Sequence, residues 1–179
     1  MGRSEGVTPL AQAPRGRHIL PDVIAPGIRL LICGSAAGAA SAAAGAYYFH
    51  PGNRFWPTLH AIGLTPHRVA PMDYMSVLAW GIGMTDLCKT QSGSDTALDR
   101  AHDDPLRLRR LVMRYNPATL AFNGKRAARS FFERPVDYGR QPARLGQTTV
   151  FVLPSTAGLA GGVWDIGHWR DMARFVRAG

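Results

Sequence analysis

Side chains able to do chemistry follow three of the apolar segments in this sequence. Asp86 lies at the end of GIGMTDL, Asn123 at the end of ATLAFNG, and Ser155 with Thr156 directly after TTVFVLP. A carboxylate can hold water as a general base, an amide can read the hydrogen-bonding edge of a ligand, and hydroxyls can contact a phosphate. A general base, a reading amide and two hydroxyls are therefore the candidate reactive groups.

A fourth apolar segment, IRLLICG, is followed by a loop of the opposite character. Residues 35–49 contain only two serines and two tyrosines among small and apolar residues, and the dense run HPGNRFW comes next. Small side chains let a ligand approach the main chain closely. This loop is therefore expected to offer backbone N–H groups to a ligand instead of side chains.

The sequence patterns around these residues predict an α/β domain that would position them. Four apolar runs that do not alternate predict parallel strands covered on both faces, at Ile28–Gly34, Gly81–Leu87, Ala118–Gly124 and Thr148–Pro154. Helical patterns fall between and after them, over residues 54–63, 104–115, 125–133 and 164–178. We expect a mostly parallel four-stranded sheet, with the site at the carboxyl ends of its strands.

Length and composition predict one folded domain with a short tail. The 179 residues suit a single domain. Residues 1–20 are read as a flexible basic tail and residues 21–179 as the domain. No apolar run reaches the length of a membrane span, and the first residues lack a signal-peptide core, so we expect a cytoplasmic protein without membrane contact. Cys33 and Cys88 stand in apolar surroundings and are expected to be buried free thiols.

The charge favours a polyanionic partner. The formal net charge is +9 and most of the 21 basic residues are arginines. They concentrate in RLRRLVMR, in GKRAARSFFER and in the last ten residues. A pI near 10.5 fits nucleic acid or a phosphorylated ligand. The arginine bias of a GC-rich genome would give a similar composition, so charge alone leaves the partner open.

Together, the motifs GSAAG, GAYYFHPGNRFWPTLHAIGLT, GIGMTDL, FNGKRA and VLPSTAGLA resemble the uracil-DNA glycosylase superfamily. The likeness runs from about Asp22 to the end of the chain, and HPGNRFW is its most specific part. The mismatch-specific uracil/thymine branch is the most similar. The combination of YYFHPGN, LPST and FNG also resembles the hypoxanthine-DNA glycosylase branch.

This resemblance implies a three-layer α/β/α fold and a repair activity. Such a protein flips a deaminated base, here most simply uracil, out of DNA and hydrolyses its N-glycosidic bond in base excision repair. Flipping costs least at mismatched or unpaired bases. The chemistry needs no cofactor and no metal, the partner is damaged DNA, and a monomer is expected.

One departure from the family pattern puts the catalytic group in question. The mismatch-specific branch carries GINPG where this chain has GSAAG, so Ala36 replaces the asparagine that orients the attacking water. Ser155 likewise stands in place of a second asparagine. Backbone N–H groups at Gly34, Ser35 and Ala36 can still stabilise charge on the departing base, as an oxyanion hole does. Asp86 is the predicted replacement for the missing asparagine; capping the next loop or pairing with Lys89 is its alternative role.

The resemblance also assigns residues to binding. Tyr48 matches the aromatic residue that stacks on the flipped base, with Tyr47 structural, and Asn123 either reads the base edge or forms a turn before Gly124. Leu159 matches a wedge that fills the space left in the duplex. The predicted substrate-binding set is Gly34, Tyr48, Asn123 and Ser155, and the predicted DNA-binding set is His50, Arg54, Thr156, Gly158 and Leu159. Asn53 is expected to brace the pocket loop by hydrogen bonds.

Three other functions remain open at this stage. A superfamily member without the water-orienting asparagine can bind damaged DNA with little cleavage. The YYFHPGN likeness suggests hypoxanthine or xanthine as the target instead. An unrelated nucleotide-binding α/β protein is disfavoured, because the sequence has neither a GxxxxGK[ST] loop nor a GxGxxG fingerprint.

Overall fold

The computed structural model describes residues 16–157 and 164–179, which fold around a single sheet. Its strand order is β2-β1-β3-β5-β4, with β4 antiparallel to β5 and the other pairs parallel. The strands are β1 (Leu30–Gly34), β2 (Ile82–Asp86), β3 (Thr119–Asn123), β4 (Gly139–Leu145) and β5 (Thr148–Leu153). The α/β prediction is confirmed, with five strands rather than four.

The strand missed by the sequence is the polar edge strand β4. Its sequence GRQPARL has no apolar run, and most of its side chains are half-buried or exposed. The ladder to β5 breaks between Arg140 and Arg144, where Pro142 lies. An edge strand needs only one apolar face and tolerates a proline at an irregularity. A search for continuous apolar runs cannot find such a strand.

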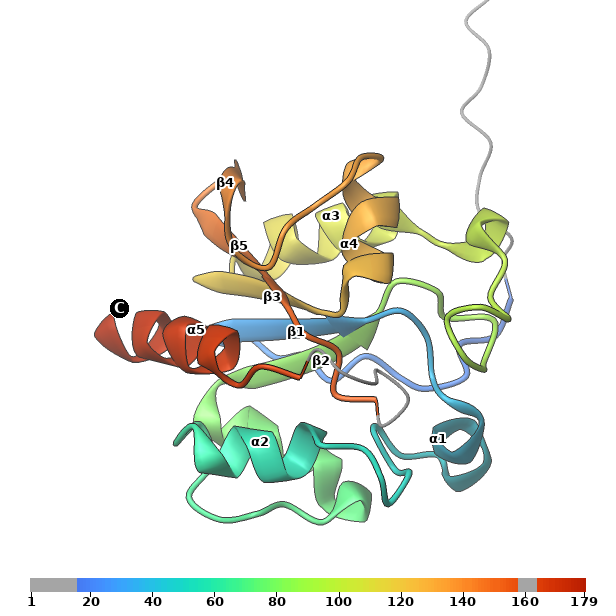
Figure 1. The fold of residues 1–179 in the computed structure, drawn as a ribbon, viewed down its shortest axis with the longest axis horizontal. Coiled ribbons are helices and arrows are strands. Elements are labelled where there is room, and N and C mark those ends of the chain that lie inside the picture. Colours follow the sequence, from blue (N-terminus) through green and yellow to red (C-terminus); the bar gives the residue numbers. More distant parts are fainter. Residues whose placement is uncertain (1–15, 158–163) are drawn as a thin grey trace, which may run out of the picture.

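The helices form one layer on each face of the sheet (Figure 1). They are α1 (Ala39–Ala44), α2 (Phe55–Ala61), α3 (Pro105–Tyr115), α4 (Lys125–Phe132) and α5 (Gly167–Ala178), with short 3₁₀ segments at Pro71–Trp80 (η1) and Arg100–His102 (η2). The four predicted helices exist with ends shifted by a few residues. The alanine-rich α1 and the segment η1 were not predicted, because neither has an apolar stripe at helical spacing.

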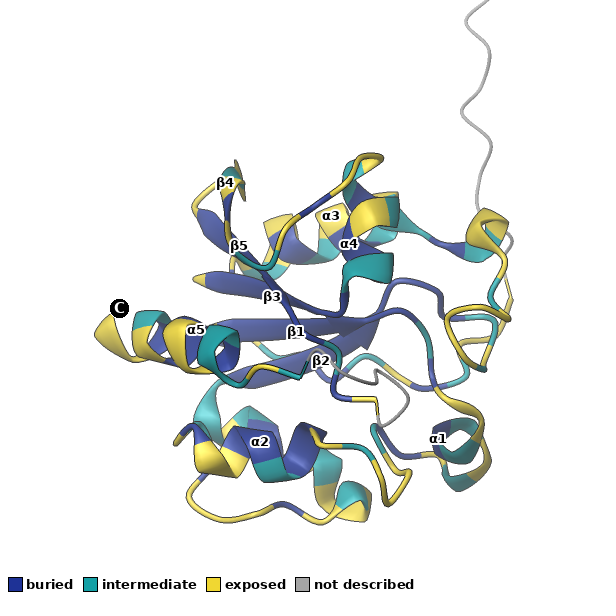
Figure 2. Cartoon of the chain, viewed as in Figure 1, coloured by how far each residue is buried: buried dark blue, intermediate teal, exposed yellow. Residues whose placement is uncertain are grey.

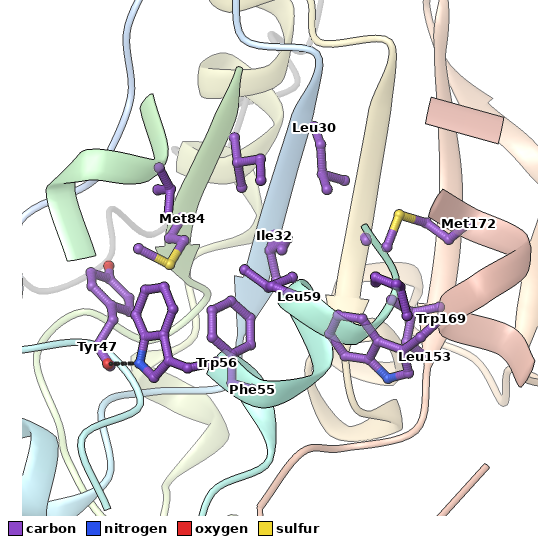
Figure 3. Close-up of a cluster of buried hydrophobic side chains, with 14 of the residues drawn as sticks. Leu30, Ile32, Tyr47, Phe55, Trp56, Leu59, Met84, Leu153, Trp169 and Met172 are labelled. Carbon is purple, nitrogen blue, oxygen red and sulfur yellow. Dashed lines mark hydrogen bonds between the residues drawn. The ribbon is translucent and has the colours of Figure 1, made fainter. Parts of the chain in front are cut away.

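Successive strand residues supply two separate cores, one on each face. Leu30 and Ile32 pack with α2 and α5, whereas Leu31 and Cys33 pack with α3 and α4. The strands β1, β2, β3 and β5 are buried along their whole length (Figure 2). Aromatic rings dominate the first core, where the Trp56 indole donates to the Tyr47 carbonyl at 3.1 Å (Figure 3). These two faces explain why the strand sequences do not alternate.

Three further expectations can be compared with the fold. Cys33 and Cys88 are buried free thiols, as predicted. Ile19 and Leu20, expected in the tail, pack with the domain: Leu20 is buried, and the Ile19 N–H donates to the Lys89 carbonyl at 2.8 Å. Within the described residues, no helix has the length and apolar character that crossing a membrane requires.

Candidate active site

The carboxyl ends of β1 and β2 bring Asp86 against Gly34. The two residues are aligned in the parallel ladder. A Cβ added to Gly34 would lie 2.5 Å from Asp86 Oδ1 and 3.3 Å from the Tyr48 hydroxyl. A side chain there would displace the Asp86 carboxyl, so glycine lets these two polar groups approach the end of β1. Gly34, Tyr48 and Asp86, singled out from the sequence, therefore meet at one point.

Asp86 is a buried carboxyl without a donor. Only 3% of the residue is exposed, and no described residue donates a hydrogen bond to its carboxylate. Burial raises the pKa of Asp86 to about 6, with the cations Lys89 and Arg107 opposing that rise and the charge of Asp22 adding to it. A carboxyl with this pKa can accept a proton near neutral pH, which is what a general base requires.

The Asp86 side chain does not take either of its alternative roles. The Lys89 ammonium pairs with Asp22 at 3.0 Å and donates to the Tyr47 hydroxyl at 3.0 Å. No N–H group of the described residues in the following loop donates a hydrogen bond to the Asp86 carboxylate. The position of Asp86 is therefore compatible with binding water or substrate.

Tyr48 is held in an unusual backbone conformation beside this carboxyl. Its φ of 53° is rare for a bulky residue and marks a locally strained position. Phe55 stacks on its ring at 3.7 Å between centroids, which leaves a single ring face for a ligand. The buried hydroxyl has no described hydrogen-bond partner. Burial and the charge of Asp86 raise its pKa above the usual range.

The small-residue loop after β1 is fastened through its carbonyls. Those of Gly34, Ser35 and Ala37 accept from the N–H groups of residues 87, 88 and 93 at 2.9, 2.8 and 2.9 Å. Within the described residues, the N–H groups of Ser35 and Ala36 donate to no acceptor. A rigid loop with N–H groups to spare suits the backbone role expected from the sequence.

A second group of predicted residues joins β3 to the loop after β5. The Asn123 amide donates to the Thr156 hydroxyl at 2.8 Å and accepts from the Thr156 N–H at 3.0 Å. Thr156 is fully buried, so its hydroxyl faces Asn123 and not solvent. Ser155 packs against Gly124, whose φ of 109° only glycine adopts readily. Asn123 therefore ties two strand ends together, and its amide keeps only part of its hydrogen-bonding capacity for a ligand.

HPGNRF folds into linked turns at the start of α2. The Gly52 N–H donates to His50 Nδ1 at 3.0 Å, and the Phe55 N–H donates to Asn53 Oδ1 at 3.0 Å. The Arg54 N–H bonds the Thr156 carbonyl at 2.9 Å, while its exposed guanidinium lies 5.4 Å from the Trp164 ring centroid. These bonds match the bracing expected of Asn53. The side chain of Arg54 and the exposed His50 face solvent beside the site.

A partly buried ion network behind Asp86 was missed by sequence reasoning. Asp22 pairs with Lys89 at 3.0 Å and with Arg107 at 2.9 Å, and Thr85 donates to Asp22 at 2.6 Å. The two cations lower the pKa of Asp22, although its burial acts against them. Asp22 precedes an apolar run and Arg107 lies in a basic helix. No local pattern in the sequence links the two.

The predicted residues thus divide into two adjoining clusters. Gly34, Ser35, Tyr48 and Asp86 form the first, with Ala36 half-buried beside them. Asn123, Ser155 and Thr156 form the second. Gly158 and Leu159 lie outside the described residues. The described part of the chain holds no group of three His, Cys, Asp or Glu side chains that could bind a metal ion.

Comparison with known proteins agrees with this geometry. The solution NMR structure of a proposed uracil DNA glycosylase from Methanosarcina acetivorans aligns with a TM-score of 0.60 and 23% identity, over 88% of this chain and 96% of that one. This likeness shows a shared fold. The model of the uracil DNA glycosylase superfamily matches residues 21–163, most of the chain. The protein therefore belongs to the uracil DNA glycosylase superfamily.

Proposed function

We propose that this protein is a monofunctional DNA glycosylase that hydrolyses the N-glycosidic bond of a deaminated base, with uracil as the first candidate. The observation that carries the proposal is the buried carboxyl of Asp86, set against Gly34 and Tyr48 at the carboxyl edge of the sheet. Family membership gives the reaction class, and the site offers a base where the usual asparagine is replaced by Ala36.

The proposed reaction uses groups that lie within this one site. Asp86 takes a proton from a water molecule as its oxygen attacks the sugar carbon C1′. The bond from C1′ to the base breaks, and its electron pair leaves with the base. N–H groups of Ser35 and Ala36 stabilise that negative charge. The base anion then takes up a proton and Asp86 gives up the one that it took, so the products are the free base and an abasic sugar that carries the new hydroxyl.

The remaining predicted residues act in substrate capture. The free face of Tyr48 stacks on the flipped base, while Asn123 orients its edge with the capacity that Thr156 leaves unused. Arg54 and His50 are exposed beside the site and contact the DNA backbone. Ser155, Thr156, Gly158 and Leu159 belong to the loop expected to enter the duplex, with Thr156 acting through its main chain. The protein works as a monomer in base excision repair.

The direct test is a single-turnover assay on a panel of oligonucleotides. Each carries uracil, a thymine mismatch, hypoxanthine or xanthine, in duplex and single-stranded form. We expect cleavage of at least uracil, at a rate that Asp86→Ala, prepared in parallel, lowers by about 10²-fold or more. Cleavage of hypoxanthine alone would favour the purine branch. Tight binding without cleavage of any member would support a damage-binding protein and reject the enzymatic proposal.

DNA affinity should depend steeply on salt. Basic residues that contact phosphates release counterions, so log K should fall almost linearly with the logarithm of salt concentration. The formal charge of +9 makes this test informative. Fluorescence anisotropy with a uracil-containing duplex at increasing salt measures the slope. A flat response between low and physiological salt would count against DNA as the partner.

A further inference from the structure

The charged groups behind Asp86 form one connected network. Lys89, of which 4% is exposed, bridges the Asp22 carboxylate and the Tyr47 hydroxyl. Tyr47 in turn donates to the Pro21 carbonyl at 3.1 Å, and Arg107 pairs with the second oxygen of Asp22. Four segments far apart in the sequence are thereby joined next to the end of β2.

The same network holds the main chain at Asp86 itself. Arg107 donates to the Asp86 carbonyl and, at 3.2 Å, to the Thr85 hydroxyl. The Thr85 hydroxyl in turn donates a hydrogen bond to Asp22 at 2.6 Å. The Asp86 carbonyl and the side chain of the preceding Thr85 are therefore bonded to fixed charges, which limits how the main chain that carries the carboxyl can move away from Gly34.

We infer that Asp22, Lys89 and Arg107 are positioning residues, which hold Asp86 in place and keep its carboxyl ionised during hydrolysis. This inference rests on the proposed function of Asp86 as the base. None of the three touches the substrate in this account. Their effect reaches the reaction only through Asp86, by main-chain bonds and by the net positive charge of two cations around one anion.

The electrostatic part has a definite sign for each member. Burial favours the neutral form of Asp86, and Lys89 followed by Arg107 opposes it, whereas Asp22 acts with burial. Removing Lys89 or Arg107 should therefore raise the pKa of Asp86, and removing Asp22 should lower it. A network remote from Asp86 would give no such opposition of signs.

Other titratable groups near the carboxyl must be separated from this effect. Cys33 on β1 and the tyrosines 47 and 48 before α2 face Asp86, and burial raises the pKa of each, so they stay neutral near pH 6. His18 lies on the outer side of the network. Burial followed by the charge of Lys89 lowers its pKa from 6.5. Titration of His18 is thus the event most easily mistaken for titration of Asp86 in a pH series.

The experiment is a pH series of single-turnover rates on a uracil-containing single strand, from pH 5 to pH 8. For Lys89→Met the midpoint should move up, so that the rate at pH 5.5 relative to pH 8 falls by about two- to fivefold compared with wild type. Asp22→Asn should move the midpoint down. Arg107→Met repeats the upward shift and replaces Lys89→Met if that variant fails to fold in a thermal melt.

Two matched variants complete the series. Tyr47→Phe removes a hydrogen bond to Lys89 without removing charge, and His18→Gln removes the other titrating group; both should keep the wild-type midpoint. Unchanged midpoints in folded Lys89→Met and Arg107→Met would overturn the inference while leaving Asp86 as the base. Absence of any pH step in the wild type would overturn the proposed function of Asp86 and this inference with it.

Discussion

Two buried aspartates of this protein are placed in opposite ways. Asp103, before α3, accepts from Arg126 at 2.9 Å and from the Ser130 hydroxyl at 2.6 Å. The Asp86 carboxylate, at the end of β2, accepts no hydrogen bond from the described residues and lies against Gly34. A buried charge is normally paired, because burial without a partner is costly. Asp103 therefore has a structural role, and the exception at Asp86 is the observation on which its proposed role as general base rests.

The same contrast extends to the neighbouring tyrosines. The Tyr47 hydroxyl donates to the Pro21 carbonyl and accepts from Lys89. The Tyr48 hydroxyl has no described partner, and its backbone is strained. Unpartnered polar groups thus gather on the side of the sheet edge that faces the proposed substrate, while their sequence neighbours are fully bonded. Ligand-binding sites commonly keep polar groups unpaired and backbone strained, at a cost in folding stability.

The largest expected effect is on catalysis. Asp86→Ala should lower the single-turnover cleavage rate by about 10²-fold or more, as for loss of an acid–base group. Its DNA affinity should barely change, since removing a carboxylate does not weaken attraction to phosphates. Adding Ala36→Asn to Asp86→Ala should restore part of the rate, by returning an amide to the family's water-orienting position.

The matched control for that experiment is Asp103→Asn. This substitution removes a carboxylate that is also buried but lies just before α3, outside the proposed site. The folded fraction of the variant should therefore cleave at a rate within about threefold of wild type. Thermal melts of both variants establish how much protein is folded. A folded Asp86→Ala that cleaves as fast as Asp103→Asn would remove the functional distinction between the two aspartates.

Stability should change in opposite directions at the two positions. Because the pKa of Asp86 rises from 3.8 to about 6 on folding, its ionised form destabilises the fold above pH 6, by on the order of 3 kcal/mol. Asp86→Asn should therefore raise the unfolding free energy at pH 8. Asp103→Asn should lower it by about 2–4 kcal/mol, through loss of a buried pair.

The difference in unfolding free energy between wild type and Asp86→Asn should depend on pH. Below pH 3.8, the unfolded-state pKa, the Asp86 carboxyl of the wild type is neutral in the folded and in the unfolded protein. The gain in unfolding free energy from Asp86→Asn should therefore fade as the pH falls from 6 to 4. Urea denaturation of wild type and variant at pH 4.5, 6 and 8 measures the difference. An advantage that stays constant over this range, or an Asp86→Asn variant less stable at pH 8, would contradict the raised pKa.

The smallest expected effect separates the two tyrosines. Tyr48→Phe removes an unpartnered buried hydroxyl and keeps the ring, so it should stabilise the protein by about 1 kcal/mol. Tyr47→Phe removes two hydrogen bonds and should destabilise it by about 1–2 kcal/mol. Chemical denaturation at pH 7 resolves both changes. Equal effects of the two substitutions would show that the hydroxyl of Tyr48 has a partner in solution.

The sequence predicts the parts of this molecule that depend on local pattern. The apolar runs at β1, β2, β3 and β5 are enough to place strands, and with them the carboxyl ends that carry Asp86 and Asn123. The strand β4 has no such run, because its arginines suit an exposed edge and its one buried side chain is the polar Gln141. α1 has alanines at nearly every position, so no apolar stripe distinguishes it from a loop.

The interior of the site depends on contacts that sequence spacing does not encode. Placing Asp86 on Gly34 requires the register of β1 and β2. The pairing of Asp22 with Lys89 and Arg107 requires three segments to meet at one point. The clamp between Asn123 and Thr156 requires the loop after β5 to bend back over β3. Each is a consequence of topology, so only the three-dimensional fold reveals it.

The most direct test of the central claim is the pH dependence of cleavage by the wild-type protein. If Asp86 is the base, the single-turnover rate should rise with pH, with a midpoint near 6, and level off above pH 7, because only the ionised carboxyl accepts a proton from water. Asp86→Ala should show a low rate without this step. A wild-type rate that stays flat from pH 5 to pH 8, or a step that survives in Asp86→Ala, would contradict the account.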